Sequence, residues 1–111
     1  MAVCQAQGCK VEVPAALGES ALCVLHYVVW LDGNCAAMRR ETAPTGATTA
    51  RHDQIAEFLR EHGERLSHVA TCGIKLSDDM KARVLNAFLS LMNLRENLER
   101  AMERARAYPA H

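Results

Sequence analysis

Apolar residues recur at three- and four-residue steps through much of the second half of the chain. Between residues 49 and 72 the recurring positions are Ile55, Phe58, Leu59, His62, Leu66, Val69 and Ala70. This spacing is the period of a helix with one buried stripe. Thr48 or Thr49 suits the N-cap, and Gly73 suits the end, where glycine enters the left-handed conformation without steric cost. The pattern predicts a helix over residues 49–72.

A second helical pattern begins at residue 77 and persists to about residue 107. Ser77 is a favourable N-cap, and Asp78 and Asp79 place negative charge at the positive end of the helix dipole. The apolar face consists of Val84, Phe88, Leu91, Leu98 and Met102, widened by Leu85, Met92 and Leu94. Pro109 stops the pattern. Helices average roughly 11 to 12 residues, so we expect the C-terminal half of this long helix to project or to pack on another subunit.

The segment 24–31 is more apolar than one helix face requires, and it includes Tyr27 and Trp30. We expect a helix over residues 23–40 that packs its additional apolar surface against the two later helices. A strand at residues 28–30 is the alternative, because β-branched and aromatic residues favour strands.

Between the two halves, residues 41–48 contain a proline, a glycine and three threonines, a composition typical of a loop or linker. The predicted organisation is an N-terminal unit over residues 1–40, a linker over 41–48 and a helical hairpin over 49–108. The fold class is therefore mainly α, with a three-helix assembly.

Four residues of types that commonly bind metals lie near the N-terminus in the pattern C-x4-C-x13-C-x2-H. They are Cys4, Cys9, Cys23 and His26. Zinc prefers four sulfur or nitrogen ligands in a tetrahedron, and two short-spaced pairs joined by a longer loop provide them. Gly8 permits a tight turn before the second cysteine. The pattern predicts one structural Zn²⁺ ion, and the simpler interpretation is that these side chains only pack in a core.

Between the two ligand pairs the sequence predicts a short β-hairpin. Val11 and Val13 alternate with Glu12, residues 17–20 can turn, and residues 21–22 can return. The signatures Cys-x3-Gly-Cys and Leu-Cys-x2-His-Tyr resemble those of compact treble-clef Cys3His zinc fingers, and the chain resembles small uncharacterised bacterial proteins that join such a finger to a helical tail. The resemblance covers about thirty residues and implies a zinc finger over residues 1–40 with a terminal helix. It implies a metal-held fold and no particular reaction.

Composition and charge indicate a cellular compartment and argue against some classes of binding partner. The longest apolar run, residues 21–31, contains His26 and is shorter than the roughly 20 residues that cross a bilayer. We therefore expect a cytoplasmic protein without membrane contact, in which five cysteines are better explained by metal binding and free thiols than by disulfides. Thirteen basic and thirteen acidic residues give zero formal net charge, so nucleic-acid binding is not expected.

A site with four protein ligands suggests a structural role, and the chain has no HExxH motif, phosphate-binding loop or GxSxG elbow. We expect a non-catalytic interaction or adaptor module that binds protein, including a second copy of itself through the last helix. One alternative is a regulatory nucleic-acid-binding zinc finger protein that uses Arg39, Arg40 and Arg51. Another is a metal or redox sensor.

Two lesser hypotheses concern the remaining cysteines and histidines. The candidates for a second metal site are Cys35, Cys72, His52, His62 and His68, of which His68 and Cys72 have helical spacing. Cys35 or Cys72 could also be a reactive thiol if basic groups lowered its pKa. The competing interpretation is that these residues pack in or beside the core.

Overall fold

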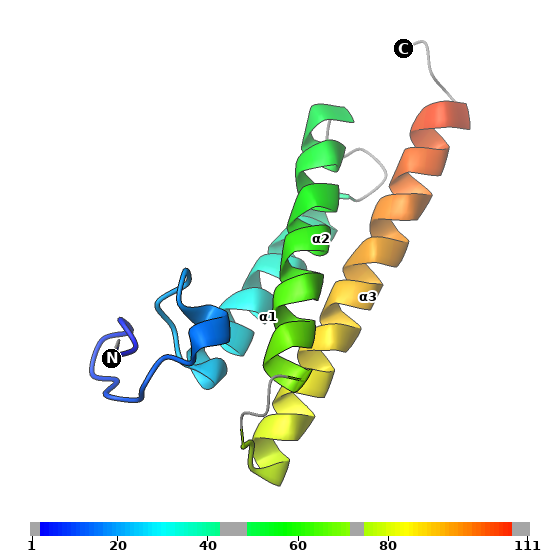
Figure 1. Cartoon of the computed structure of the whole chain (residues 1–111). Helices are drawn as coiled ribbons and strands as arrows, with labels where there is room; N and C mark the ends of the chain where they lie inside the picture. The colour runs from blue at the N-terminus through cyan, green and yellow to red at the C-terminus, as the bar shows by residue number, and fades with distance from the viewer. Residues whose placement is uncertain (1–2, 43–48, 72–74, 108–111) are drawn as a thin grey trace.

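The computed structural model describes residues 3–42, 49–71 and 75–107. Its elements are the 3-10 turn η1 (Ala15–Leu17) and the helices α1 (Val24–Glu41), α2 (Thr49–Thr71) and α3 (Asp78–Ala107). α2 and α3 lie side by side and run in opposite directions, and α1 packs on α3 (Figure 1). The 30-residue α3 has a length of about 45 Å and accounts for most of the 52 Å long axis of the molecule.

The first helix forms where the sequence predicts it, one residue later at each end. Cys23 is the N-cap in an extended conformation, and Thr42 at the C-cap donates its backbone N–H to the carbonyl of Met38 over 3.1 Å. Arg39 and Arg40 occupy the last turn, where positive charge stabilises the negative end of the dipole. The alternative strand at residues 28–30 is wrong, because these residues lie inside α1.

The two later helices also agree with the hydrophobic pattern. The Ser77 hydroxyl accepts a hydrogen bond from the backbone N–H of Met80 at 3.1 Å, as expected of an N-cap. α2 begins at Thr49 and is described as far as Thr71. The predicted boundary residues Thr48, Gly73 and Pro109, and most of the predicted linker, lie outside the described residues.

The core is built from the inward faces of all three helices. Its fully buried large side chains are Leu17, Tyr27, Val28, Leu31, Cys35, Ile55, Leu66, Val69 and Leu94. Each buried aliphatic side chain of this size contributes about 1.5–3 kcal/mol from its transfer out of water. Leu17 is the one that comes from η1, and this turn packs on α2.

The predicted β-hairpin is not formed in the part of the chain that the structure describes, where the elements are helical. Val11 accepts a hydrogen bond from Cys4, and Ala21 accepts one from Gln5, so each pairs with the first cysteine segment rather than with the other. Val3 and Glu12 form an isolated antiparallel bridge. Pro14 has no N–H to donate to a strand ladder and instead caps η1, which buries Leu17.

No helix in the described ranges combines the length and apolar content needed to cross a membrane.

Candidate metal centre

The four residues of the C-x4-C-x13-C-x2-H pattern meet at one place. Cys4, Cys9, Cys23 and His26 each offer one ligand atom, and these atoms all lie within 4.8 Å of one another. The His26 Nδ1 atom lies 3.3 Å from the sulfur of Cys4 and 3.3 Å from that of Cys23. The sulfurs of Cys9 and Cys23 are 4.0 Å apart. The geometry therefore assigns Nδ1, rather than Nε2, as the nitrogen donor.

Local backbone structure places the first pair of cysteines. The backbone N–H of Cys4 donates to Val11, and that of Cys9 donates to Ala6 at 3.0 Å, which closes a tight turn between the two cysteines. Gly8 adopts φ +79°, a left-handed conformation that favours glycine. This turn accommodates four intervening residues, where most treble-clef knuckles have two.

The second pair is positioned by the start of α1. Cys23 is the N-cap, and His26 follows three residues later in the first helical turn. Residues three apart in a helix lie on the same side, so both ligand atoms point toward the N-terminal segment. The preceding Ala21 has φ +57°, which turns the chain from the 3-10 segment into the helix start.

The measured spacing fits a tetrahedral metal ion. With Zn–S bonds near 2.3 Å and Zn–N bonds near 2.0–2.1 Å, the edges of a tetrahedral site are about 3.5–3.8 Å. The observed separations of 3.3 Å and 4.0 Å fall on either side of that range. Three sulfurs and one imidazole form a soft donor set, which suits zinc or another late transition metal better than magnesium or calcium.

The thiols are held in unlike electrostatic environments. Burial alone would raise the pKa of Cys4, but hydrogen bonds from the Cys23 and Ala6 backbone and from His26 and Cys9 outweigh it and lower the pKa to about 6. Burial raises the pKa of Cys23, and the neighbouring sulfurs of Cys4 and Cys9 raise it further. Three thiolates this close repel one another, and a divalent cation at their centre removes that repulsion.

The other candidate residues do not form a second cluster. Among the described residues, the Cys3His group is the only set of three or more potential ligands that converge. His52 and His62 are buried apart from it, His68 is exposed, and Cys72 lies outside the described residues. The hypothesis of a second metal site therefore has no support from the residues that can be described.

Cys35 does not have the properties of a reactive thiol. It is buried in α1 with 1 % of its surface exposed. Burial, together with the nearby carboxylate of Asp32, raises its pKa to about 11, while Arg39 acts in the opposite direction. A thiol in this environment stays protonated near neutral pH, which indicates a packing role.

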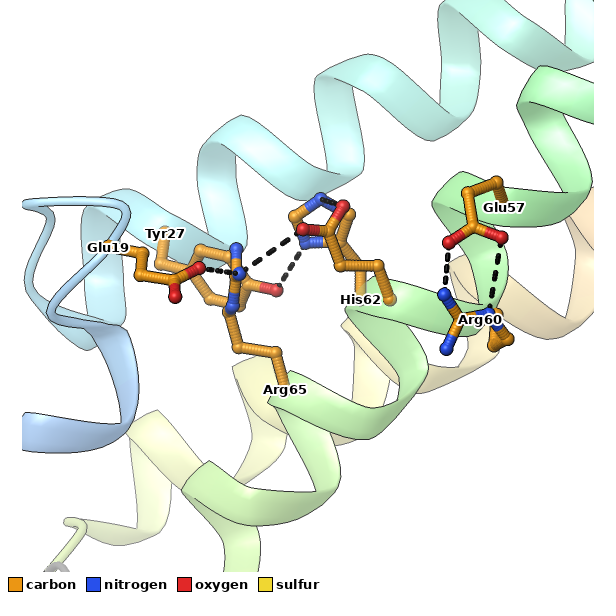
Figure 2. A network of polar contacts seen from close by, with 7 residues as sticks. Glu19, Tyr27, Glu57, Arg60, His62 and Arg65 are labelled. Atoms are coloured by element: carbon orange, nitrogen blue, oxygen red, sulfur yellow. Dashed lines mark hydrogen bonds and ion pairs between the residues drawn. The ribbon is translucent and has the colours of Figure 1, made fainter.

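A polar network that joins the N-terminal segment to α2 was not predicted from the sequence. Tyr27 Oη lies 2.8 Å from Nδ1 of the buried His62, and Arg65 contacts Glu19 at 2.9 Å and Glu61 at 3.3 Å (Figure 2). Burial raises the pKa of Tyr27 to about 12 and lowers that of His62, so both are neutral at pH 7 and the phenol donates to the imidazole. Helical periodicity places His62 on the buried face, but no sequence signal identifies its partner.

The described fold and site together define a class of protein: three helices with a Cys3His candidate metal centre at the start of the first. No family model matches the chain, and comparisons with the curated proteins and with the solved structures returned no match. The resemblance to treble-clef fingers therefore rests on the ligand pattern and on its place at a helix start, without support from a family match.

Proposed function

We propose that this protein is a non-catalytic interaction module in which one structural zinc ion holds the N-terminal segment on a helical scaffold. The observation that carries the proposal is the convergence of Cys4, Cys9, Cys23 and His26 within 4.8 Å. Zinc is the metal proposed because it combines the preference for sulfur and nitrogen ligands with the tetrahedral spacing.

The N-terminal segment needs such a crosslink because it has little else to hold it. In the described residues before α1, Val13 and Leu17 are the buried aliphatic side chains, and the regular structure amounts to η1 and one bridge. Structural zinc contributes roughly 10–16 kcal/mol to the folding of finger peptides near neutral pH. A contribution of that size is sufficient to order twenty residues that cannot bury a core of their own.

A structural role is favoured over a catalytic one by the ligand count. Catalytic zinc usually has three protein ligands and a water molecule in the fourth position, next to a general base. Here four protein side chains converge, which is the number of donors that a full tetrahedron requires, and Cys4 and Cys23 are almost completely buried. The proposal is therefore that the metal shapes a surface and takes no part in a reaction.

Elemental analysis of the purified full-length protein tests the metal and its ligands together. We expect one zinc per chain in the wild type and clearly less in Cys9→Ser and His26→Ala. Cys35→Ser is the matched control, because it removes a buried thiol outside the cluster, and it should retain one zinc. A wild-type protein that contains no metal and keeps its shape in strong chelator would contradict the proposal.

The nucleic-acid alternative has less support from the position of its arginines. Arg51 donates to the carboxylate of Glu41 at 2.6 Å, which neutralises part of the group formed by Arg39, Arg40 and Arg51. A duplex-binding titration at several salt concentrations separates the two functions, since phosphate contacts lose affinity steeply as salt rises. The sensor alternative predicts instead that mild peroxide releases zinc and rearranges the helices.

A further inference from the structure

α3 carries a second apolar face that does not contribute to the core. Leu85, Leu89 and Met92 are 60 %, 47 % and 56 % exposed, whereas Val84, Leu91 and Leu94 are buried. The three exposed residues follow one another at four- and three-residue steps, so they lie on one side of the helix. We call Leu85, Leu89 and Met92 the outer stripe.

The outer stripe continues into a groove between α2 and α3. This groove has a volume of about 610 Å³, and its lining includes Leu59 and Gly63 from α2 together with Phe88, Met92 and Met102 from α3. Met92 belongs to both features, and Phe88 is only half-buried at their junction. Stripe and groove thus form one largely apolar surface along the two antiparallel helices, with Arg60, Arg95 and Glu99 among the residues that line the groove.

Gly63 gives this surface a place where another backbone can approach closely. It lies inside α2, where glycine is an unfavourable residue because of its backbone entropy. No positive φ requires a glycine there, and a Cβ atom built at this position meets nothing within 4 Å. No other part of the chain fills this space, so a helix docked in the groove has room to approach α2 closely at Gly63.

In one relative orientation of two copies, the charges that flank the outer stripe of one copy face opposite charges of the other. Lys81 lies four residues before Leu85, and Glu96 lies four residues after Met92. Both are exposed, and neither has an ion pair among the described residues. When two copies of α3 pack antiparallel with Leu85 opposite Met92, Lys81 of each copy faces Glu96 of the other. A parallel pair would place lysine against lysine and glutamate against glutamate.

At the ends of this antiparallel contact, acidic residues of the two copies face each other. Asp78 of one copy comes opposite Glu99 of the other, but Arg83 pairs with Asp79 at 3.1 Å and Arg95 pairs with Glu99 at 3.1 Å within each helix. The guanidinium groups of Arg83 and Arg95 therefore accompany each of these acidic pairs.

We propose that the outer stripe and its groove bind a second copy of this chain through an antiparallel α3–α3 contact with two-fold symmetry. The proposal rests on the proposed function, because it names the partner of the interaction module. A two-fold contact of this kind uses the same surface on both copies and closes on itself, so it forms dimers rather than filaments.

Sedimentation of the zinc-loaded full-length protein over a wide concentration range tests the dimer. We expect a concentration-dependent shift from monomer to dimer, and Leu89→Glu should raise the dimer dissociation constant at least tenfold. Val29→Glu is the matched control, because Val29 is 54 % exposed on α1 and lies outside the outer stripe. It should leave the dissociation constant unchanged. Equal effects of the two variants would overturn the proposal.

Charge reversal tests the antiparallel orientation. Lys81→Glu and Glu96→Lys should each weaken the dimer, and the double variant should restore it, since both inter-copy pairs regain opposite charges. Single reversals without effect would overturn the antiparallel contact. A wild-type protein that keeps its zinc and stays monomeric at every concentration would overturn the dimer and leave the metal centre intact, whereas failure of the proposed function would appear as missing zinc.

Discussion

Single residues at the contact between α1 and α2 show how burial sets protonation in this protein. The centroid of the His62 ring lies 4.5 Å from that of Phe58 and 5.1 Å from that of Trp30. His62 also accepts a hydrogen bond from the Tyr27 hydroxyl. Burial lowers its pKa below the ordinary value, and Arg65 lowers it further, while Glu61 acts in the opposite direction. Arg65 and Glu61 on α2, with Tyr27 on α1 and Glu19 on the N-terminal segment, are the ionisable groups around it.

The lowered pKa of His62 predicts a stability change with pH. Above the unfolded-state pKa of about 6.5, His62 is neutral in both states and contributes no pH dependence. As the pH falls below that value, the unfolded chain takes up a proton that the folded chain resists, so the free energy of unfolding decreases until the lower folded pKa is passed. Chemical denaturation at a series of pH values measures this slope.

His62→Gln should lack the part of the slope that comes from this residue, whereas the exposed control His68→Gln should keep it. Comparing each variant with the wild type cancels the acid sensitivity of the metal centre, which all three proteins share. An identical slope in the wild type and His62→Gln would contradict the prediction.

At the scale of single elements, the start of α3 depends on one side chain. The Ser77 hydroxyl accepts the N–H of Met80, one of the first backbone donors of α3. Ser77→Ala should therefore reduce the free energy of unfolding by about 1 kcal/mol, within a range of 0.5–2 kcal/mol. Thermal or chemical denaturation measures the loss, with Ser67→Ala in the exposed interior of α2 as a control that should change little.

α1 and α2 each contain a glycine that their own structure does not require. A Cβ at Gly33 or Gly63 meets nothing within 4 Å. Gly33→Ala and Gly63→Ala should each stabilise the monomer by roughly 0.5–1 kcal/mol, because alanine has the lower backbone entropy when unfolded. Denaturation at concentrations below dimer formation should show similar gains. A loss of stability in Gly63→Ala under those conditions would mean that its site is already filled within the chain.

At the scale of the whole molecule, we predict that the N-terminal segment with the metal centre loses its structure independently of the helical core. The N-terminal segment reaches α2 through η1 and through the ion pair between Arg65 and the exposed Glu19, and it adds Cys4, Val13, Leu17 and Cys23 to the buried cluster. Ion pairs of this kind contribute only about 0–1 kcal/mol. Removing the metal should therefore release the segment before it affects the helices.

Hydrogen exchange with and without chelator measures that difference. We expect the amides of Cys4, Gln5 and Cys9, which are hydrogen-bonded in the structure, to lose protection on metal removal. Amides in the middle of α2 and α3 should keep most of theirs. Simultaneous loss of protection throughout the chain would show instead that the metal supports the whole fold.

The local pattern of residues along the sequence determined much of the structure that could be predicted. The three helices follow from three- and four-residue periodicity, and the start of α3 follows from Ser77, because both depend on residues within one or two turns. The convergence of Cys4, Cys9, Cys23 and His26 could also be predicted, since two short spacings bring each pair together and a tetrahedral metal site requires both pairs.

Tertiary structure decided which of several local possibilities was realised. The hairpin was not formed because Val11 pairs with Cys4 and because Pro14, which has no N–H for a strand ladder, caps the turn that buries Leu17. The Tyr27–His62 hydrogen bond joins residues 35 positions apart, which periodicity alone cannot pair. The sequence also placed Leu85 and Met92 on one broad apolar face of α3, and only packing against α1 and α2 divided that face into a buried side and an exposed one.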